Sequence, residues 1–387
     1  MKKKRINQIL SYVLVALISV AVTLAVLLGI FVSKRQTSNK LELLEQLILD
    51  YFIGEADQTA MEDAAAHAMI GALGDQWSYY IPADSYQRYL EQMKNVYVGI
   101  GVTISKAEDA SGVKVIEVVA GGPAEEAGIQ VGDVIIKLDG QPIAGMEPSE
   151  AKKLIQGKAE TTVAFGVLRN GTELTLAVAC REIKIPVAES QMLTDEIGLV
   201  RIVNFNSNCA TETIAAIEEL KEQGASKLIF DVRNNPGGYA KELVKVLDYL
   251  LPEGKLFTRV DYKGREHTDM SDAKYLDMPM AVLINGQSYS AAEFFAAALA
   301  EYDAATVVGE KTVGKGYFQS TFELPDGSAV GLSIGKYYTP KGASLADVGI
   351  TPHVSVTVDA ETAAQIQAGL LEPMQDPQIL AAVEAIA

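Results

Sequence analysis

The sequence predicts an α/β core built from crossover βα units, a small β-rich domain before it, and an N-terminal transmembrane helix. Three observations support this division. Residues 9–32 carry no charge, a strand-like alternation of β-branched residues begins near Tyr97, and predicted strands and helices alternate from Gly198 onward. The chain has 387 residues, 49% hydrophobic and 21% charged, which is enough for more than one domain with a packed core.

The uncharged stretch of residues 9–32 is long enough to cross a bilayer as a helix. It runs directly into Ser33 and Lys34 without the small residues of a signal-peptide cleavage site, so we expect an uncleaved anchor. Four basic residues precede it in residues 1–8 and two follow it. This excess predicts a single-pass protein of the cell membrane, with a cytoplasmic N-terminus and an extracytoplasmic body.

The remaining chain is acidic. Beyond the first 35 residues there are 27 basic and 50 acidic side chains, a balance that repels nucleic acid and excludes it as a partner. The three histidines are scattered and form no metal-binding pattern, so we expect neither a metal nor another cofactor. Two interpretations of Cys180 and Cys209 stay open, a disulfide in an extracytoplasmic chain or two buried thiols.

Residues 40–95 are predicted to form a small helical segment between the membrane and the body. Apolar residues recur with the helical period in residues 41–51, and the Ala-rich residues 61–73 continue the pattern. Residues 74–82 break the helix, and residues 83–93 are again helical in pattern.

Residues 96–181 are predicted to form the β-rich domain. Residues 97–106 and 113–119 alternate as strands, and a hairpin is expected around Asn170-Gly171. The run GPAEEAGIQVGDVI, residues 122–135, follows a strand and the sequence YVGIG. Together these features resemble a PDZ domain of the circularly permuted kind found in bacterial proteases.

The PDZ resemblance implies a binding loop for a peptide's terminal carboxylate. The peptide would add to the sheet as a strand while backbone amides of the loop hold its end. In this sequence the loop falls on Val98, Gly99, Ile100 and Gly101. The alternative is a Gly-rich entry to a strand that binds no ligand.

Residues 182–360 are predicted to form the α/β core. From Gly198 onward strands and helices alternate, which predicts a largely parallel sheet. The predicted strands are residues 198–205, 227–232 and 280–285, and the predicted helices are residues 210–223, 240–250 and the segment after residue 290. Functional loops of such sheets lie beyond the carboxyl ends of the strands, where DVRNNPGG and NGQSYS fall. Residues 361–387 are predicted to be a C-terminal helical segment.

The sequence NNPGG is ordinary turn chemistry in isolation, but here it follows a predicted buried strand. Gly237 and Gly238 would let the backbone approach a ligand and point N–H groups at a developing oxyanion. We expect Asp231 and Arg233 to brace this loop rather than to react.

Ser290 lies where a predicted strand gives way to a helix, and it is the candidate nucleophile. Ser290 with Glu293 is also an S-x-x-E capping box, which stabilises a helix without any chemistry. Lys315 and Gln319 lie four residues apart beyond the next predicted strand, and none of the three histidines lies in a context that provides a Ser-His-Asp set.

A lysine serves as a general base only when it is neutral. Lowering its pKa from about 10.4 to 7 or 8 destabilises the ammonium by roughly 4 kcal/mol, which burial can supply. Lys315 lies between Gly314 and Gly316, which permits a close, partly buried approach. The amide oxygen of Gln319 would hold the lysine without a charge that keeps it protonated.

The order of DVRNNPGG, N-x-x-S-x-S-A-A-E, VVGEKTVGKGYFQ and YYTPKGASLADVGITPH closely resembles the carboxy-terminal processing proteases, also called tail-specific proteases. The resemblance covers residues 41–358. These proteins are Ser/Lys endopeptidases with an inserted PDZ domain, and the resemblance implies a crotonase-like core. It places the nucleophile on Ser290, the general base on Lys315 and the supporting amide on Gln319.

The same resemblance implies an oxyanion hole of backbone N–H groups, one on Ala291 and one in the loop of Gly237 and Gly238. It also implies that the PDZ domain captures substrate tails and gates the site. Substrates would be extracytoplasmic polypeptides with apolar C-terminal tails. A homo-oligomer is left open.

Three positions depart from the family pattern. Tyr289 precedes the nucleophile where relatives have a small residue, and Ala292 stands before Glu293. The bulk of Tyr289 is expected to narrow the approach to Ser290 or to reshape the pocket. His353 replaces an acid after G-I-T-P and is expected to affect strand packing.

Two functions other than that of a protease are also compatible with the sequence. The first is a catalytically silent PDZ receptor that binds tails and signals to a partner. The second is esterase or acyl-transfer chemistry on the same Ser-Lys pair.

Overall fold

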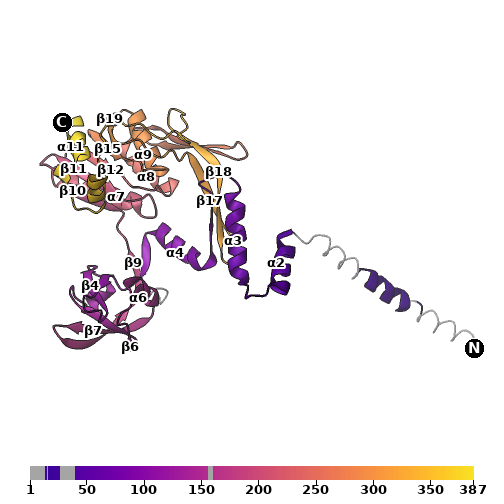
Figure 1. Ribbon diagram of the computed structural model, residues 1–387. Coiled ribbons are helices and arrows are strands. Elements are labelled where there is room, and N and C mark those ends of the chain that lie inside the picture. The colour runs from indigo at the N-terminus through magenta and orange to yellow at the C-terminus, as the bar shows by residue number, and fades with distance from the viewer. Residues whose placement is uncertain (1–13, 15, 27–39, 156–159) are drawn as a thin grey trace, which may run out of the picture. The chain divides into compact units, whose positions relative to one another are not determined.

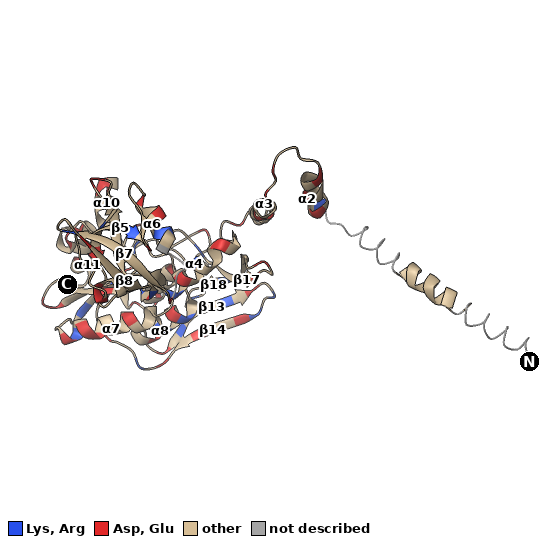
Figure 2. Cartoon of the chain, turned by 90° about the horizontal axis from the view of Figure 1, so that it is seen from below, with Lys and Arg blue, Asp and Glu red and all other residues tan. Residues whose placement is uncertain are grey.

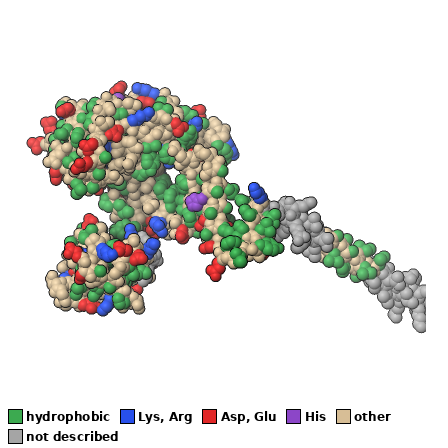
Figure 3. Space-filling model, in the orientation of Figure 1, with side chains coloured by type: hydrophobic (Ala, Val, Ile, Leu, Met, Phe, Trp, Pro, Cys, Tyr) green, Lys and Arg blue, Asp and Glu red, His purple; other side chains and the backbone are tan. Residues whose placement is uncertain are grey.

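The computed structural model describes residue 14 and residues 16–26, 40–155 and 160–387 (Figure 1). The chain divides into two compact units, Met1–Gln76 and Trp77–Ala387. In the first unit, α2 (Lys40–Tyr51) and α3 (Gln58–Gly71) confirm the helices that the periodicity predicts. Apolar side chains of α2 are exposed (Figure 3), among them Leu41, Leu43, Leu44, Leu47 and Leu49.

The predicted membrane span, residues 9–32, lies partly outside the described residues. Residues 14 and 16–26 are helical, with exposed side chains. No helix within the described part of the chain combines the length and the apolar character needed to cross a membrane. The anchor therefore stays a prediction from the sequence.

The second unit begins with β1 (Tyr79–Ile81) and α4 (Ala83–Lys94). Asn95 ends α4 in a left-handed conformation, with φ 55°. The chain then enters β2 (Val96–Gly99), which pairs antiparallel with β9 (Arg181–Lys184).

The small β-rich domain is an antiparallel sheet in the order β3-β4-β5-β7-β8. Its elements are β3 (Val102–Lys106), β4 (Val113–Val118), α5 (Pro123–Glu126), β5 (Val134–Leu138), β6 (Gln141–Pro142), α6 (Pro148–Ile155), β7 (Thr162–Arg169) and β8 (Thr172–Ala179). Asn170 and Gly171 both have positive φ, as a two-residue hairpin turn requires. The single strand expected over residues 97–106 is instead two, because Gly101 turns the chain with φ 80°.

A six-stranded sheet forms the α/β core in the order β10-β11-β12-β15-β16-β19. The strands are β10 (Ala188–Met192), β11 (Ile197–Ile202), β12 (Lys227–Asp231), β15 (Met280–Ile284), β16 (Ala305–Gly309) and β19 (Val354–Ser355). All neighbours are parallel except β10, which pairs antiparallel with β11 at one edge. The largely parallel sheet is therefore confirmed.

Helices cover both faces of this sheet. The cluster on one face contains α7 (Cys209–Glu222), α8 (Ala240–Leu250) and α9 (Ala291–Glu301), with Phe230 and Val282 from the strands. The other face packs Ile229 and Leu283 against α11 (Pro377–Ala385), which follows α10 (Ala360–Gln367) and the 3-10 helix η1 (Pro373–Gln375). Because neighbouring residues on a strand point to opposite faces, both faces are apolar. The acidic residues of α7 (Figure 2) are not among its buried residues.

A second sheet, which the sequence analysis did not predict, carries part of the site. Its order is β1-β18-β13-β14, with β17 paired to β18. The strands are β13 (Gly254–Asp261), β14 (Glu266–Ser271), β17 (Tyr317–Glu323) and β18 (Ala329–Tyr338).

Cys180 and Cys209 are both buried thiols and form no disulfide. Cys180 belongs to the core of the β-rich domain and Cys209 to the core of the α/β domain. Burial raises the pKa of Cys209 to about 12. His353 accepts a hydrogen bond from the N–H of Val307 on β16 through Nδ1, which fits the expected role in strand packing.

Candidate active site

Ser290 ends the turn of residues 285–290, called here the nucleophile turn, and α9 begins at the next residue. Its backbone has φ 59° and ψ −122°, a strained conformation for a residue with a side chain. The hydroxyl of Ser288 donates to the carbonyl oxygen of Val232 at 2.7 Å and accepts from the N–H of Asn285. The bond to Val232 anchors the turn to the residue that follows β12, and Ser290 itself is half-buried.

Glu293 connects the nucleophile to the base. One oxygen of its fully buried carboxylate accepts the backbone N–H groups of Ser290 and Lys315, each at 2.8 Å. The other oxygen accepts the hydroxyl of Thr312 at 2.6 Å and the N–H of Gly314 at 2.7 Å. The glutamate of the predicted capping box therefore also holds residues 310–316, called here the base loop.

The base loop packs tightly against residues 345–349. A Cβ on Gly314, which has φ 93°, would lie 2.9 Å from the N atom of Gly349. A Cβ on Gly316 would lie 2.4 Å from the N atom of Ala346. Only glycine permits this approach on either side of Lys315, which is half-buried as the sequence predicted.

The side chain of Lys315 lies against two aromatic rings. Its Nζ is 4.8 Å from the ring centroid of Trp77 and 5.7 Å from that of Tyr289, and the two rings are 5.9 Å apart. Each such cation–π contact contributes about 0.5–2 kcal/mol, depending on exposure. Trp77 was not identified as a site residue from the sequence, because nothing in the GDQWSYYIP stretch indicates that it lies beside residue 315.

Gln319 lies on β17 and is held by β18. Its amide nitrogen donates to the hydroxyl of Ser333 at 3.0 Å. The N–H of Ser333 in turn donates to the hydroxyl of Ser78, the neighbour of Trp77. Gln319 and the aromatic contacts of Lys315 are thus joined through β18, while the contact of the Gln319 amide oxygen with Lys315 stays a prediction.

The loop of residues 232–239, called here the glycine loop, lies directly against Ser290. A Cβ on Gly237 would lie 2.8 Å from both the N atom of Ala291 and the Cβ of Ser290. The N–H of Gly237 already donates to Asn235 at 2.8 Å. Phe205 donates to the carbonyl of Gly237 and accepts from the N–H of Tyr239. Of the two glycines, Gly238 is therefore the better candidate for the predicted oxyanion donor.

A cavity of ≈ 10 Å³ adjoins Ser290. Apart from Ser290 its walls are apolar or aromatic, formed by Gly238, Ala240, Leu243, Phe257, Ala291, Phe294 and Tyr337. Burial raises the pKa of Tyr337 to about 12, so its phenol is neutral at ordinary pH. The cavity has room for a methyl-sized group.

Comparison with known proteins identifies the family of this site. The sequence profile of Peptidase family S41 matches residues 196–356, and the profile of the PDZ domain matches residues 98–180. The chain is 33% identical over 313 residues to the carboxy-terminal processing protease CtpA of Bacillus subtilis, covering 80% of this chain and 66% of that protein. This chain belongs to the carboxy-terminal processing proteases of family S41, with a PDZ domain.

Two further comparisons agree with this family. A protein named as a probable CtpA-like serine protease of Staphylococcus aureus (strain COL) is 30% identical over 335 residues, covering 85% of this chain and 66% of that protein. A structure described as an S41 protease from Bacteroides fragilis has a TM-score of 0.51 at 17% identity, covering 86% of this chain and 92% of that chain, and supports the fold. This chain spans about two thirds of the length of the two named relatives.

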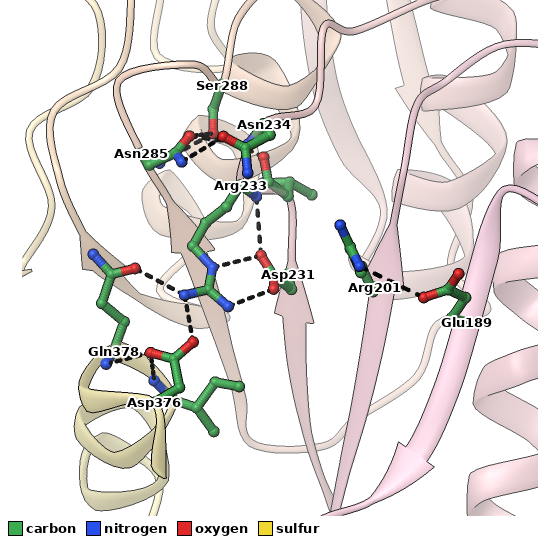
Figure 4. A network of polar contacts seen from close by, with 11 residues as sticks. Glu189, Arg201, Asp231, Arg233, Asn234, Asn285, Ser288, Asp376 and Gln378 are labelled. Carbon is green, nitrogen blue, oxygen red and sulfur yellow. Dashed lines mark hydrogen bonds and ion pairs between the residues drawn. The ribbon is translucent and has the colours of Figure 1, made fainter. Parts of the chain in front are cut away.

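The glycine loop of this processing protease is braced from two sides. On one side, the N–H of Asn234 donates to the Asn285 side chain, and the Asn285 amide donates back to Asn234, each at 2.9 Å (Figure 4). The N–H of Tyr289 also donates to the carbonyl of Asn235. The glycine loop and the nucleophile turn are therefore fixed to each other.

On the other side, Arg233 joins the glycine loop to the C-terminal helix. Its guanidinium donates to Asp231 at 2.7 Å and to Asp376 at 2.7 Å, with Gln378 as a further acceptor (Figure 4). Burial alone would lower the pKa of Arg233, but the two carboxylates outweigh it and raise the pKa. The expected bracing by Asp231 and Arg233 is confirmed, whereas the sequence did not reveal Asp376.

The PDZ domain of the protease presents the predicted binding loop at the entry to its sheet. Val98 and Gly99 lie on β2, Ile100 is buried, and Gly101 makes the turn into β3. In the sheet order β3 pairs with β4 and is an edge strand. This edge suits the addition of a peptide strand, while binding by these four residues stays a prediction.

Proposed function

We propose that the chain is a serine endopeptidase in which Ser290 and Lys315 form the catalytic dyad. The observation that carries this proposal is the shared oxygen of Glu293, which holds the nucleophile turn and the base loop together. The half-buried position of Lys315 further supports a lowered pKa, which a lysine base needs.

In the proposed reaction the hydroxyl of Ser290 attacks the peptide carbonyl carbon while neutral Lys315 accepts its proton. The N–H groups of Gly238 and Ala291 stabilise the oxyanion. The lysine ammonium then protonates the leaving amine as the C–N bond breaks, which leaves an ester on Ser290. Water attacks this ester with Lys315 again as base, and Ser290 recovers its proton.

The proposed substrates are polypeptides with apolar C-terminal tails. The PDZ domain would capture the tail as a strand along β3, with its carboxylate in the loop of residues 98–101, and would gate the site. The apolar walls and small volume of the cavity beside Ser290 favour a small apolar residue before the cleaved bond.

The protease is further proposed to be a single-pass membrane protein that acts outside the cytoplasm. This rests on the uncharged residues 9–32 and on the basic residues on both sides of them. Gln319 is proposed to support Lys315 through its amide oxygen.

Assays of cleavage and of tail binding distinguish the proposed protease from a silent receptor and from an esterase. The full chain in detergent is incubated with an unfolded protein that ends in an apolar tail, beside Ser290→Ala. We expect wild type to cleave, and both proteins to bind the tail peptide. If wild type and Ser290→Ala both fail to cleave the protein but still bind the tail peptide, the chain is a silent receptor. Turnover of small esters without cleavage of the protein would indicate an esterase.

A further inference from the structure

Two aromatic rings lie around Lys315. Tyr289 and Trp77 come from different parts of the second unit, and their rings tilt at 31° with Lys315 Nζ near both centroids. Tyr289 is fixed by its N–H bond to Asn235, and its position next to Ser290 keeps the ring at the site. Burial raises the pKa of Tyr289, so the ring stays neutral and cannot pair with the lysine as a phenolate.

Ring faces attract an ammonium and do not attract a neutral amine in the same way. Two rings against Nζ therefore stabilise the charged form of Lys315, whereas the proposed reaction needs the neutral form. The contact opposes the desolvation that lowers the pKa of a half-buried lysine. Both effects contribute to the working pH of the base.

Other charged and titratable groups lie on the elements around the base loop. Glu293 of α9 is bonded to four donors of the nucleophile turn and base loop. Asp347 accepts from the hydroxyl of Tyr317 on β17, and Lys336 of β18 lies over the Tyr317 ring. Asp75 lies two residues before Trp77 in the sequence. All of these stay unchanged when residue 289 is varied, so their influence on Lys315 cancels in the comparison.

We propose that Tyr289 and Trp77 form an aromatic clamp that stabilises the ammonium of Lys315 and thereby sets the lowest pH at which the dyad works. The inference rests on the proposed Ser-Lys mechanism. Tyr289 is a positioning residue in this account, because it acts on the reaction only through Lys315.

The first test is the pH profile of kcat/KM for the full chain in detergent, with a tail peptide as substrate. Tyr289→Leu removes the ring and keeps an apolar side chain, and Tyr289→Phe keeps the ring. Tyr289→Leu is expected to move the acid limb about half a pH unit lower, corresponding to about 0.7 kcal/mol, and Tyr289→Phe to leave its midpoint in place. Trp77→Leu should move the limb in the same direction.

Tyr262→Leu serves as the control, because Tyr262 is 70% exposed and its ring lies against Lys263, at 5.3 Å, instead of Lys315. It is expected to leave the profile and the activity unchanged. Equal midpoints for Tyr289→Leu, Trp77→Leu and Tyr289→Phe would overturn the clamp.

A second readout separates the clamp from the dyad. In Ser290→Ala, the Nζ-linked carbon of Lys315 is titrated by NMR after isotopic labelling of lysine and assigned with Lys315→Arg. Adding Tyr289→Leu should lower the Lys315 midpoint by the same half unit, whether or not the wild type cleaves. An unmoved midpoint overturns the clamp, whereas a moved midpoint in a protein without Ser290-dependent cleavage overturns only the proposed function.

Discussion

The backbone N–H groups of Ser290 and Lys315 donate to the same oxygen of Glu293, each at 2.8 Å. The proposed nucleophile immediately precedes α9, and the proposed base follows β16, so the loops after the parallel strands β15 and β16 meet at one buried carboxylate. Because both loops are bound to this group, Glu293 holds the backbones of the two proposed dyad residues to each other.

Glu293→Gln is expected to lower kcat by about 10²-fold, because misplacing reacting groups by about 1 Å has effects of that size. The glutamine side chain would place an NH₂ group against hydrogen-bond donors that a carboxylate oxygen of Glu293 accepts in the wild type. The free energy of unfolding should fall by about 1–3 kcal/mol. Steady-state kinetics and urea unfolding measure the two effects, with the exposed Glu222→Gln as control. Wild-type kcat in Glu293→Gln would contradict this role.

Arg233→Met is expected to lower the free energy of unfolding by about 3–5 kcal/mol, because it leaves Asp231 and Asp376 buried without their partner. The three side chains are 3–9% exposed. Arg201→Met is the matched control (Figure 4). Arg201 and Glu189 are 3.8 Å apart, and their side chains are 39% and 62% exposed, so this ion pair should contribute only about 0–1 kcal/mol to stability. Equal urea midpoints for the two variants would refute the bracing account.

Because of Asp133, we expect the stability of the PDZ domain to depend on pH. Its carboxylate is 1% exposed, and its bonds with Arg169 and the N–H of Gln130 outweigh burial and lower its pKa. The native state therefore binds fewer protons than the unfolded state, and the stabilisation is complete above the ordinary pKa of 3.8 and is lost as pH falls through the lowered value. Thermal unfolding should show Asp133→Asn less stable than wild type at pH 6, with a smaller difference at pH 2. A constant difference would contradict this assignment.

Leu243→Ala is expected to enlarge the cavity beside Ser290 and to raise kcat/KM for peptides with Leu before the cleaved bond relative to Ala by about 10-fold. Leu247→Ala is its control, because Leu247 is buried one turn later on α8 and does not line the cavity. Both changes should destabilise the fold by about 2–5 kcal/mol. A shift in peptide preference in both variants would exclude the cavity as its cause.

The sequence was most informative where local pattern decides the structure. Alternating strands and helices predicted the parallel sheet, and Asn170-Gly171 predicted the hairpin of β7 and β8 in the β-rich domain. Both features depend on residues that are neighbours in the sequence. The second sheet was missed, since β1 and β18 are about 250 positions apart and their pairing has no local signal.

The same limit applies to the site. Ser290, Lys315 and Gln319 were named as candidates from motif order, and Gly314 and Gly316 were expected to permit a close approach. Trp77 and Asp376 were not found, because each reaches the site through tertiary packing. The hydrogen bond from the Gly237 N–H to the Asn235 side chain was also not predictable, since it depends on the folded shape of the loop.

The most direct measurement of the central claim compares cleavage of an unfolded, apolar-tailed protein by four full-length forms: wild type, Ser290→Ala, Lys315→Ala and Lys311→Ala. Lys311 is an exposed lysine of the same base loop and controls for loss of charge. The account predicts that Lys311→Ala cleaves like wild type, and that Ser290→Ala and Lys315→Ala each lose at least about 10³-fold in rate. Cleavage by Lys315→Ala within about tenfold of wild type would contradict the Ser-Lys dyad.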